Sequence, residues 1–279
     1  MTLTVEADNA AVPQVGRRER RATAARRPGA PRWVIHVGRV VLLVGFLALW
    51  ETAAREGWVN PVLFGQPSGI WTSLWEYLPS ERHFTSLTST GSAIAVAFVI
   101  GSITGTVAGL ILGLSPTVDA IVGPFMTPIN SVPRIALAPV FIAWFGLTMT
   151  AKVVLAVSIV FFILAENARS AVRSVDPDLM TMARVVGLRR ANLLLKVVLP
   201  SAVPTMFAGL RLTFTYSLLG VIASEMIAAT AGLGQDIVLF SSMFQINTTF
   251  AILVELMFIA VVITWLFGML ERWLLRWQR

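Results

Sequence analysis

The apolar residues of this chain gather into about six stretches that are each long enough to cross a lipid bilayer as a helix. A crossing needs about 20 residues, because the hydrocarbon layer is about 30 Å thick and a helix rises about 1.5 Å per residue. The predicted spans cover residues 34–53, 85–113, 118–145, 151–172, 200–228 and 249–274. An all-α, polytopic transmembrane bundle is therefore predicted, since a helix satisfies its own backbone polar groups within lipid.

The third of these stretches is interrupted by prolines at positions 124, 128, 133 and 139. A proline inside a helix removes one backbone hydrogen bond and clashes with the preceding turn. We therefore expect two helical pieces here, packed against protein neighbours.

Composition supports a membrane protein independently. Apolar residues make up 56% of the chain and charged residues 13%, whereas soluble domains carry about 25% charged residues. The absence of cysteine excludes disulfides and thiolate metal sites. His36 and His83 lie far apart in the sequence without a carboxylate cluster beside them, so no metal site is predicted.

Positive charge indicates the orientation. Arginine and lysine concentrate in three segments, residues 17–32, 173–196 and 272–279, which an even number of spans puts on one side. The positive-inside rule makes that side, with both termini, cytoplasmic. The net charge of +7 thus reflects topology and contact with anionic lipid rather than nucleic-acid binding. Residues 1–33, polar and basic, are expected to be a disordered cytoplasmic tail, ahead of a transmembrane domain at 34–279.

A charged loop at residues 174–200 separates the fourth and fifth spans. Asp176 suits a helix N-cap, Pro177 the first helical position and Asp178 the positive end of the helix dipole. Gly187 is expected to end this helix. Leu179, Met182, Ala183 and Val186 share one face at helical spacing. That face is too small to bury itself in lipid, which favours docking to a protein; the alternative is a helix lying on lipid headgroups.

The loop resembles the coupling loop of bacterial ABC importer permeases, in which Glu-Ala-Ala is followed by Gly and later by Ile-x-Leu-Pro. The matching positions here are Ala183, Gly187, Val197, Leu199 and Pro200. Thr181 and Met182 depart from the pattern, standing where the family has Glu and the first Ala. Residues 133–146, 204–211, 224–226 and 232–234 are also similar to the nitrate, sulfonate and taurine branch. The resemblance runs from about residue 49 to the C-terminus.

This resemblance implies a multi-pass permease subunit in a bacterial inner membrane. The implied partners are a cytoplasmic ABC ATPase dimer that binds ATP and Mg²⁺, a second permease copy and an extracytoplasmic solute-binding protein. The implied ATPase-coupling residues are Asp178, Thr181, Met182, Ala183, Gly187, Leu199 and Pro200. The chain itself carries no G-x-x-x-x-G-K-[ST] phosphate loop, so we expect no catalytic residues and no cofactor of its own. The implied solute is a small anion such as a sulfonate, taurine or nitrate.

Ionisable residues within the spans are candidates for the translocation pathway, because their burial without partners is costly. Arg211, Thr215 and Glu225 fall on one face of the fifth span. Arg134 adjoins the interrupted stretch, where exposed backbone groups are available to an anion. The alternative for each charged residue is a structural role, through pairing with carbonyls or other helices.

Three further patterns leave their partners open. Glu166, Arg169 and Arg173 share a face at the end of the fourth span and favour pairing within the helix. Lys152 and Glu255 have no partner that the sequence assigns. Glycines at 101, 105, 109 and 113 permit close approach of a neighbouring helix, either from this chain or from the second copy of an expected homodimer.

Two other classes of membrane protein are alternatives to an ATP-driven permease. A secondary transporter requires its own ion site and usually internal repeats, and the two halves show no convincing repeat. A membrane-embedded enzyme requires converging nucleophilic, metal or acid-base groups, which the sequence does not supply. An ATP-driven permease is the function that the sequence favours.

Overall fold

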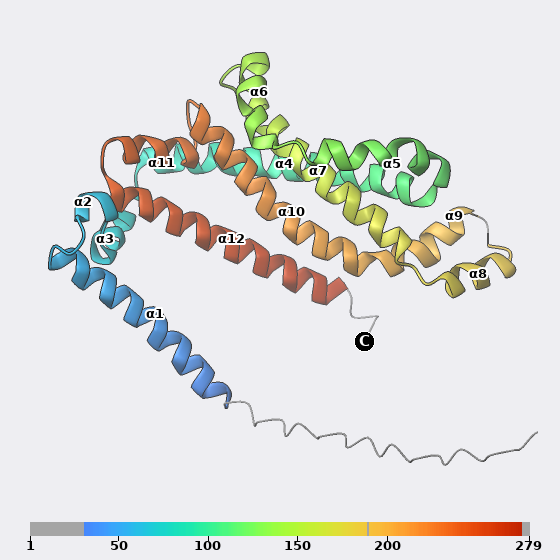
Figure 1. Cartoon of the computed structure of the whole chain (residues 1–279), viewed down its shortest axis with the longest axis horizontal. Helices are drawn as coiled ribbons and strands as arrows, with labels where there is room; N and C mark the ends of the chain where they lie inside the picture. The colour runs from blue at the N-terminus through green and yellow to red at the C-terminus, as the bar shows by residue number, and fades with distance from the viewer. Residues whose placement is uncertain (1–30, 189, 275–279) are drawn as a thin grey trace, which may run out of the picture. The chain divides into compact units, whose positions relative to one another are not determined.

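The computed structural model describes residues 31–188 and 190–274, which fold into helices (Figure 1). The chain divides into two units, residues 1–46 and 47–279, and each is described by itself. The predicted disordered tail lies outside the described residues up to residue 30, as do Arg189 and residues 275–279.

Long helices are separated along the chain by one or more shorter ones. The helices are α1 (Arg32–Arg55), α2 (Pro61–Phe64), α3 (Pro67–Tyr77), α4 (Glu81–Leu114), α5 (Pro116–Asn130), η1 (Arg134–Leu137), α6 (Ala138–Phe145), α7 (Met149–Arg173), α8 (Pro177–Val185), α9 (Arg190–Leu193), η2 (Leu194–Val198), α10 (Leu199–Ile227), α11 (Leu233–Ser242) and α12 (Ile246–Leu274).

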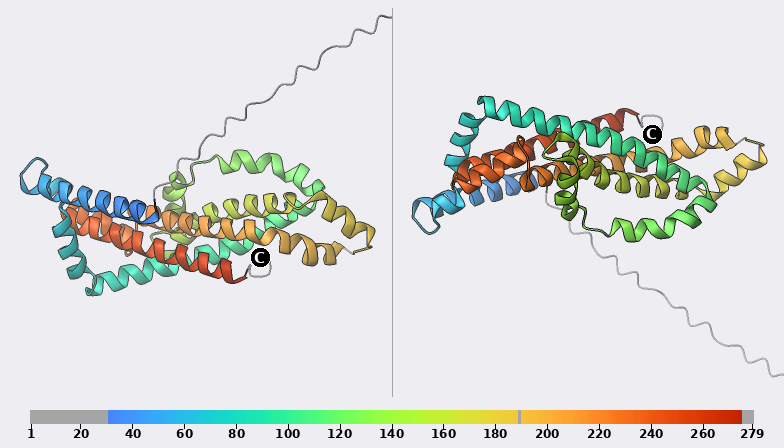
Figure 2. Two further views of the ribbon diagram at one scale, coloured as in Figure 1. Left: turned by 90° about the horizontal axis from the view of Figure 1, so that it is seen from below. Right: turned by 90° about the horizontal axis from the view of Figure 1, so that it is seen from above.

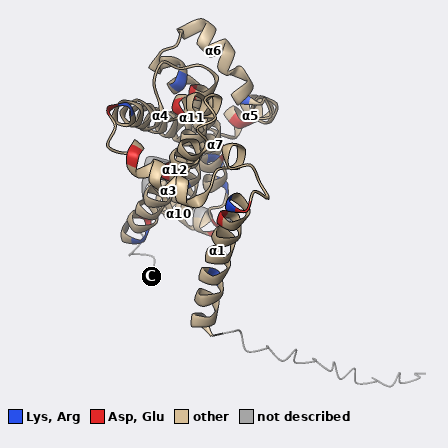
Figure 3. Cartoon of the chain, turned by 90° about the vertical axis from the view of Figure 1, so that its left-hand side faces the viewer, with Lys and Arg blue, Asp and Glu red and all other residues tan. Residues whose placement is uncertain are grey.

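Five of these helices, α1, α4, α7, α10 and α12, are long and apolar enough to cross a membrane. The pair formed by α5 and η1–α6 passes the same test as a sixth, broken span. Figure 3 shows how few charged residues interrupt these helices. The prediction of an all-helical transmembrane bundle with about six spans is confirmed.

The proline-rich stretch forms two pieces, as predicted, which meet at an angle of 82°. Ser131 ends α5, and Pro133 precedes the 3₁₀ turn of η1. Pro128 and Pro133 flank the break, where neither residue can donate a backbone hydrogen bond to continue the helix. The bend is therefore encoded locally.

Glycine fixes the central contact of the second unit, in which α4 lies along α7 and α7 along α10 (Figure 2). A methyl group on Gly101, Gly105, Gly109 or Gly113 would run into α7. The neighbour that the glycine spacing left undetermined is therefore α7 of the same chain, and the two backbones approach closely because these positions carry no side chain.

The core fills the space that these helices enclose. Its buried members include Ala93 and Ala97 of α4, Leu218 of α10, Leu233 of α11 and Ile252 of α12. A smaller cluster of Leu112, Met126 and Ala165 joins α5 to α4 and α7. Close packing of the central helices thus leaves the longer apolar side chains in separate clusters along the bundle.

We predict that Gly109→Ala destabilises the fold, whereas Gly91→Ala in the same helix does not. A methyl group at 109 meets the Ala165 carbonyl oxygen and lies 2.7 Å from the Ala168 Cβ, and neither atom can rotate away. Overpacking of this kind costs about 1–3 kcal/mol.

Gly91 is the matched control, because no atom beyond its own stretch of helix lies within 4 Å of the place that a methyl group would take there, and alanine favours the helix by about 1 kcal/mol. Thermal unfolding of both variants in detergent measures the difference. Equal melting temperatures would show that α4 does not contact α7 through this row of glycines.

Candidate functional site

A fully buried ion pair joins α7 to α10. The Lys152 Nζ lies 2.9 Å from the Glu225 Oε1, and their side chains are 7% and 0% exposed. The ammonium also donates to the Ser89 hydroxyl and to the Ala231 carbonyl oxygen. Thr90 of α4 donates to the Glu225 carboxylate at 2.9 Å. Because both charges have several partners, this pair satisfies the condition under which buried ions are tolerated.

The same carboxylate anchors the turn between α10 and α11. The Gly234 amide donates to the Glu225 Oε2 at 3.0 Å, and the Leu233 amide donates to the Thr90 hydroxyl at 2.8 Å. These are two amides of the first turn of α11, which have no acceptor within their own helix. Gly232 has φ 139°, and a side chain there would collide with the carboxylate. Glu225 thus fixes the path of the chain into α11.

A second polar cluster lies at the N-terminal ends of α4 and α11. Asp236, with a side chain that is 0% exposed, accepts from the Tyr77 hydroxyl at 2.6 Å and from the Arg82 Nε at 2.7 Å. Burial, and then the hydrogen bond to Asp236, raises the pKa of Tyr77 above its ordinary value of about 10. Tyr77 therefore remains a protonated donor at physiological pH.

His83 joins α4 to α12 in the same region. Its Nε2 lies 2.7 Å from the Glu255 Oε1, although the two residues are far apart in the sequence. The imidazole also meets the edge of the Tyr77 ring at a centroid distance of 5.2 Å. Glu255, to which the sequence assigns no partner, thus pairs with His83.

The predicted pathway face of α10 divides into different environments. Arg211 forms an ion pair with Glu271 of α12, and its side chain is 42% exposed. Thr215 is exposed, whereas Glu225 is enclosed by the network described above. Helical spacing alone placed these residues on one face but did not reveal which part of that face other helices cover.

Arg134 stabilises the break between α5 and α6. Its Nη2 donates to the Ile129 carbonyl oxygen at 3.1 Å, and its guanidinium lies over the Phe162 ring at 4.1 Å. It therefore satisfies a carbonyl at the end of α5 while stacking on α7. This geometry matches the structural alternative for Arg134 and leaves its role toward a solute open.

At the opposite end of α7, charges pair with α5. Arg169 lies 2.6 Å from Asp119 and 3.2 Å from Glu166, and Arg173 forms a further ion pair with Asp119. The expected pairing within the helix is present between Glu166 and Arg169. Asp119, the partner contributed by α5, was not singled out from the sequence.

The loop at 174–200 forms a capped helix as predicted. The Asp178 amide donates to the Asp176 carboxylate at 2.8 Å, and Gly187 adopts φ 79°. The Leu188 amide then donates to the Ala183 carbonyl oxygen, which closes the helix end. Beyond α9, the π-helical turn η2 continues directly into α10, which begins at Leu199 and Pro200.

The apolar face of α8 is only partly buried. Leu179, Met182 and Val186 are 47%, 64% and 78% exposed, whereas Ala183 is 7% exposed and turned inward. Val185, which was not assigned to that face, is 82% exposed. Asp178 and Thr181 also lie at the surface. Three large apolar side chains of α8, and Val186 directly after it, thus stand largely uncovered by the described residues of this chain.

Comparison with known proteins identifies the architecture. Residues 100–278 match the family described as binding-protein-dependent transport system inner membrane component. The chain is 30% identical to the putative aliphatic sulfonates transport permease protein SsuC of Escherichia coli K12, over 88% of this chain and 94% of that one. It is 31% identical to the riboflavin transport system permease protein RibX of Chloroflexus aurantiacus, over 87% and 90%.

A solved structure shares the fold. The inward-facing MetNI methionine ABC transporter has a chain that superposes with a TM-score of 0.61 at 18% identity. The match covers 67% of this chain and 93% of that chain.

We predict that Lys152→Met strongly destabilises the bundle and that adding Glu225→Gln restores much of the loss. The single change leaves a buried carboxylate without its counter-charge, which costs about 3–5 kcal/mol, whereas the amide in the double variant can still bond Thr90 and Gly234 without charge.

Thermal unfolding in detergent provides the measurement, with Arg55→Met as the control because the Arg55 side chain is 66% exposed in its pair with Glu51. If the two core changes simply add, the ion pair between Lys152 and Glu225 is absent from the folded protein.

Proposed function

The chain belongs to the family of binding-protein-dependent transport system inner membrane components, and we propose that it passes a small sulfonate-, taurine- or nitrate-like solute across a bacterial inner membrane as the permease subunit of an ATP-driven importer. The observation that carries this proposal is the exposed apolar surface of α8 at one end of the bundle. The membrane part supplies the path for the solute, and a separate ATPase supplies the energy.

The surface formed by Leu179, Met182, Val185 and Val186, here called the α8 patch, is proposed as the docking site of the ATPase. Large apolar side chains at such exposures favour a partner. Val172 of α7, Val175 of the loop and Val198 immediately before α10 form a small core that ties both ends of the loop together. A partner that moves α8 therefore moves the ends of two spanning helices.

Residues around the patch take supporting roles in this proposal. Asp178 stabilises the first turn of α8, and Thr181 lies beside the patch. Ala183 packs inward, Gly187 ends α8, and Leu199 and Pro200 begin α10. The loop at 174–200 thus acts as one rigid connection between partner and spans.

The remaining subunits follow from the same family membership. We assign ATP and Mg²⁺ to a cytoplasmic ATPase dimer, delivery of the solute to an extracytoplasmic binding protein, and the second half of the pathway to another copy of this chain. Six spans with both termini in the cytoplasm put α8 on the ATPase side, in agreement with the arginine and lysine residues of the loop.

The proposed solute is a small anion such as a sulfonate or nitrate, or the zwitterionic sulfonate taurine; the name of the Escherichia coli relative supports a sulfonate. The relative from Chloroflexus is named for riboflavin, so the family accommodates more than one chemistry. Among the pathway candidates, the half-exposed Arg211 and the exposed Thr215 are proposed to face the solute. Arg134 and Glu225 are proposed to position the helices around it.

We predict that Met182→Glu weakens binding of the ATPase subunit by about tenfold or more, because it introduces a charge into the centre of an apolar contact. Copurification and titration of the ATPase against the permease in detergent measure this loss.

Asn192→Glu is the matched control, since it adds the same charge to an exposed position of α9 in the same loop. Replacing Ala183 by a larger residue is a poorer test, because Ala183 is buried and the change would disturb the loop itself. Equal ATPase affinities for the two glutamate variants would rule out the α8 patch as the docking site.

A further inference from the structure

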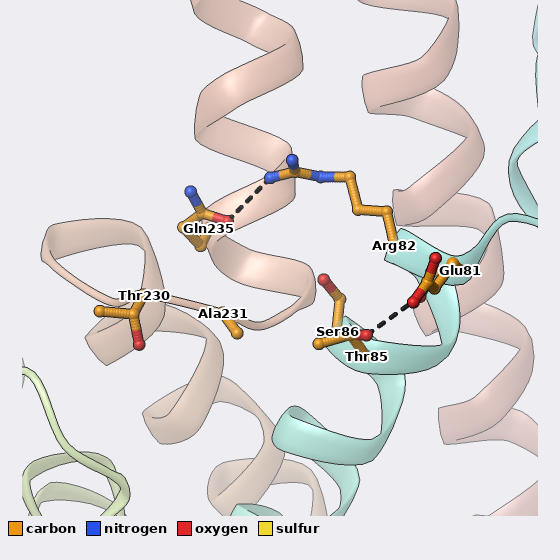
Figure 4. Close-up of a pocket in the computed structure, with 7 residues that line it drawn as sticks. All are labelled: Glu81, Arg82, Thr85, Ser86, Thr230, Ala231 and Gln235. Atoms are coloured by element: carbon orange, nitrogen blue, oxygen red, sulfur yellow. Dashed lines mark hydrogen bonds between the residues drawn. The ribbon is translucent and has the colours of Figure 1, made fainter.

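A polar pocket of about 290 Å³ lies between the first turns of α4 and the segment that leads into α11 (Figure 4). Its lining residues are Glu81, Arg82, Thr85, Ser86, Thr230, Ala231 and Gln235. This volume falls just below the range of about 300–1,000 Å³ that accommodates drug-sized ligands, so it suits a smaller molecule.

The pocket stands at the edge of the membrane rather than in its apolar layer. α4 has 34 residues, which at about 1.5 Å per residue span about 51 Å and exceed the hydrocarbon thickness of about 30 Å. The pocket occupies the N-terminal end of that helix. Water and dissolved molecules therefore reach it without crossing lipid.

Ser86 is the residue that points to a ligand. It is 3% exposed, yet its hydroxyl makes no hydrogen bond with any described residue. Figure 4 shows this hydroxyl directed into the space beside Arg82 and Gln235. The oxygen itself is not enclosed by protein atoms, so it opens into the pocket, where it can bond water or a ligand. A molecule in the pocket would provide the missing partner.

Arg82 presents further donors on the same side. Its Nε donates to Asp236 at 2.7 Å and its Nη2 to the Gln235 side-chain oxygen at 3.1 Å. A guanidinium has five N–H groups, so three remain in a group whose orientation these two bonds already fix. The two N–H groups of the Gln235 side-chain amide also remain available as donors. This side of the pocket therefore suits the oxygens of an oxyanion.

Glu81 adds the opposite charge to the rim. It is exposed and forms no ion pair within the described part of the chain. Its carboxylate would repel a simple anion but would attract an ammonium group. We propose that the pocket binds a small zwitterion, with the oxyanion held by Arg82, Ser86 and Gln235 and the ammonium held by Glu81.

Two sources supply that chemistry at a membrane edge, a dissolved aminosulfonate or amino acid and the headgroup of phosphatidylethanolamine. The wall that faces either ligand is rigid, because Lys152 holds the Ala231 carbonyl oxygen from behind at 2.6 Å. The idea that the pocket contacts the transported solute rests on the proposed function. Binding of a zwitterion in the pocket can be measured without any transport.

Site-directed labelling is suited to this test because the chain contains no cysteine. Thr230→Cys then provides a single thiol on the pocket wall, at a residue to which no ligand contact is assigned. Its rate of reaction with neutral methyl methanethiosulfonate is measured on the full chain in phosphatidylcholine nanodiscs. Taurine, ethanesulfonate and ethylamine serve as protecting probes, since the first combines the charged groups that the other two carry separately on the same two-carbon skeleton.

At equal concentration we expect taurine to slow labelling about two- to fivefold more than ethanesulfonate or ethylamine, the gain typical of one additional exposed ionic contact. Glu81→Gln in the same background is expected to remove the advantage of taurine over ethanesulfonate. Met243→Cys, at an exposed position outside the pocket, is the control and should label at a rate that taurine does not change.

Equal protection by the three probes, or protection by none, overturns the proposal. Ser86→Cys gives a second labelling position in the pocket, where weaker protection by taurine is expected because one contact to the oxyanion is removed. Slow labelling in phosphatidylethanolamine nanodiscs without any probe identifies a headgroup as the occupant, whereas fast labelling there that taurine slows identifies a dissolved zwitterion. Because no ATPase is present, failure of this test leaves the proposed importer function intact, and loss of ATP-driven uptake leaves the labelling result intact.

Discussion

The structure depends on a single constraint, that an ionised group inside an apolar bundle must find its partners within the protein. Lys152 and Glu225 meet this constraint together, and in doing so they connect α7, α10 and α4 and the turn into α11. The glycines of α4 allow it to approach α7 closely, and Gly209 and Gly220 of α10 do the same on another part of α7. Close packing and charge pairing are thus two aspects of one arrangement.

The two ends of the bundle differ in what they leave exposed. At the end that contains the N-terminus of α4, Lys152 pairs with Glu225 and Arg82 pairs with Asp236, and a polar pocket lies beside them. At the other end, α8 presents apolar side chains. One continuous helix from Lys196 to Ile227 connects these ends. A displacement at α8 can therefore reach the polar end through a rigid element, as an importer driven from the cytoplasm requires.

Local signals in the sequence were sufficient for the spans, the proline break and the cap of α8, because each depends on residues close together in the chain. The partners of Lys152, Arg211 and Glu255 could not be predicted, since they come from helices at least 60 residues away. For the same reason, helical spacing placed Thr215 and Glu225 on one face although only Glu225 is covered by other helices. The inward turn of Ala183 likewise depends on how the whole loop packs, not on the spacing of α8.

The most direct measurement is uptake of radiolabelled taurine and ethanesulfonate into proteoliposomes that contain this chain. The assay compares the chain alone under an ion gradient with the chain assembled with its ATPase, its binding protein and ATP. An ATP-driven permease predicts accumulation only in the complete assembly, with loss when ATP is replaced by a non-hydrolysable analogue. Accumulation by the chain alone under the ion gradient would contradict the account.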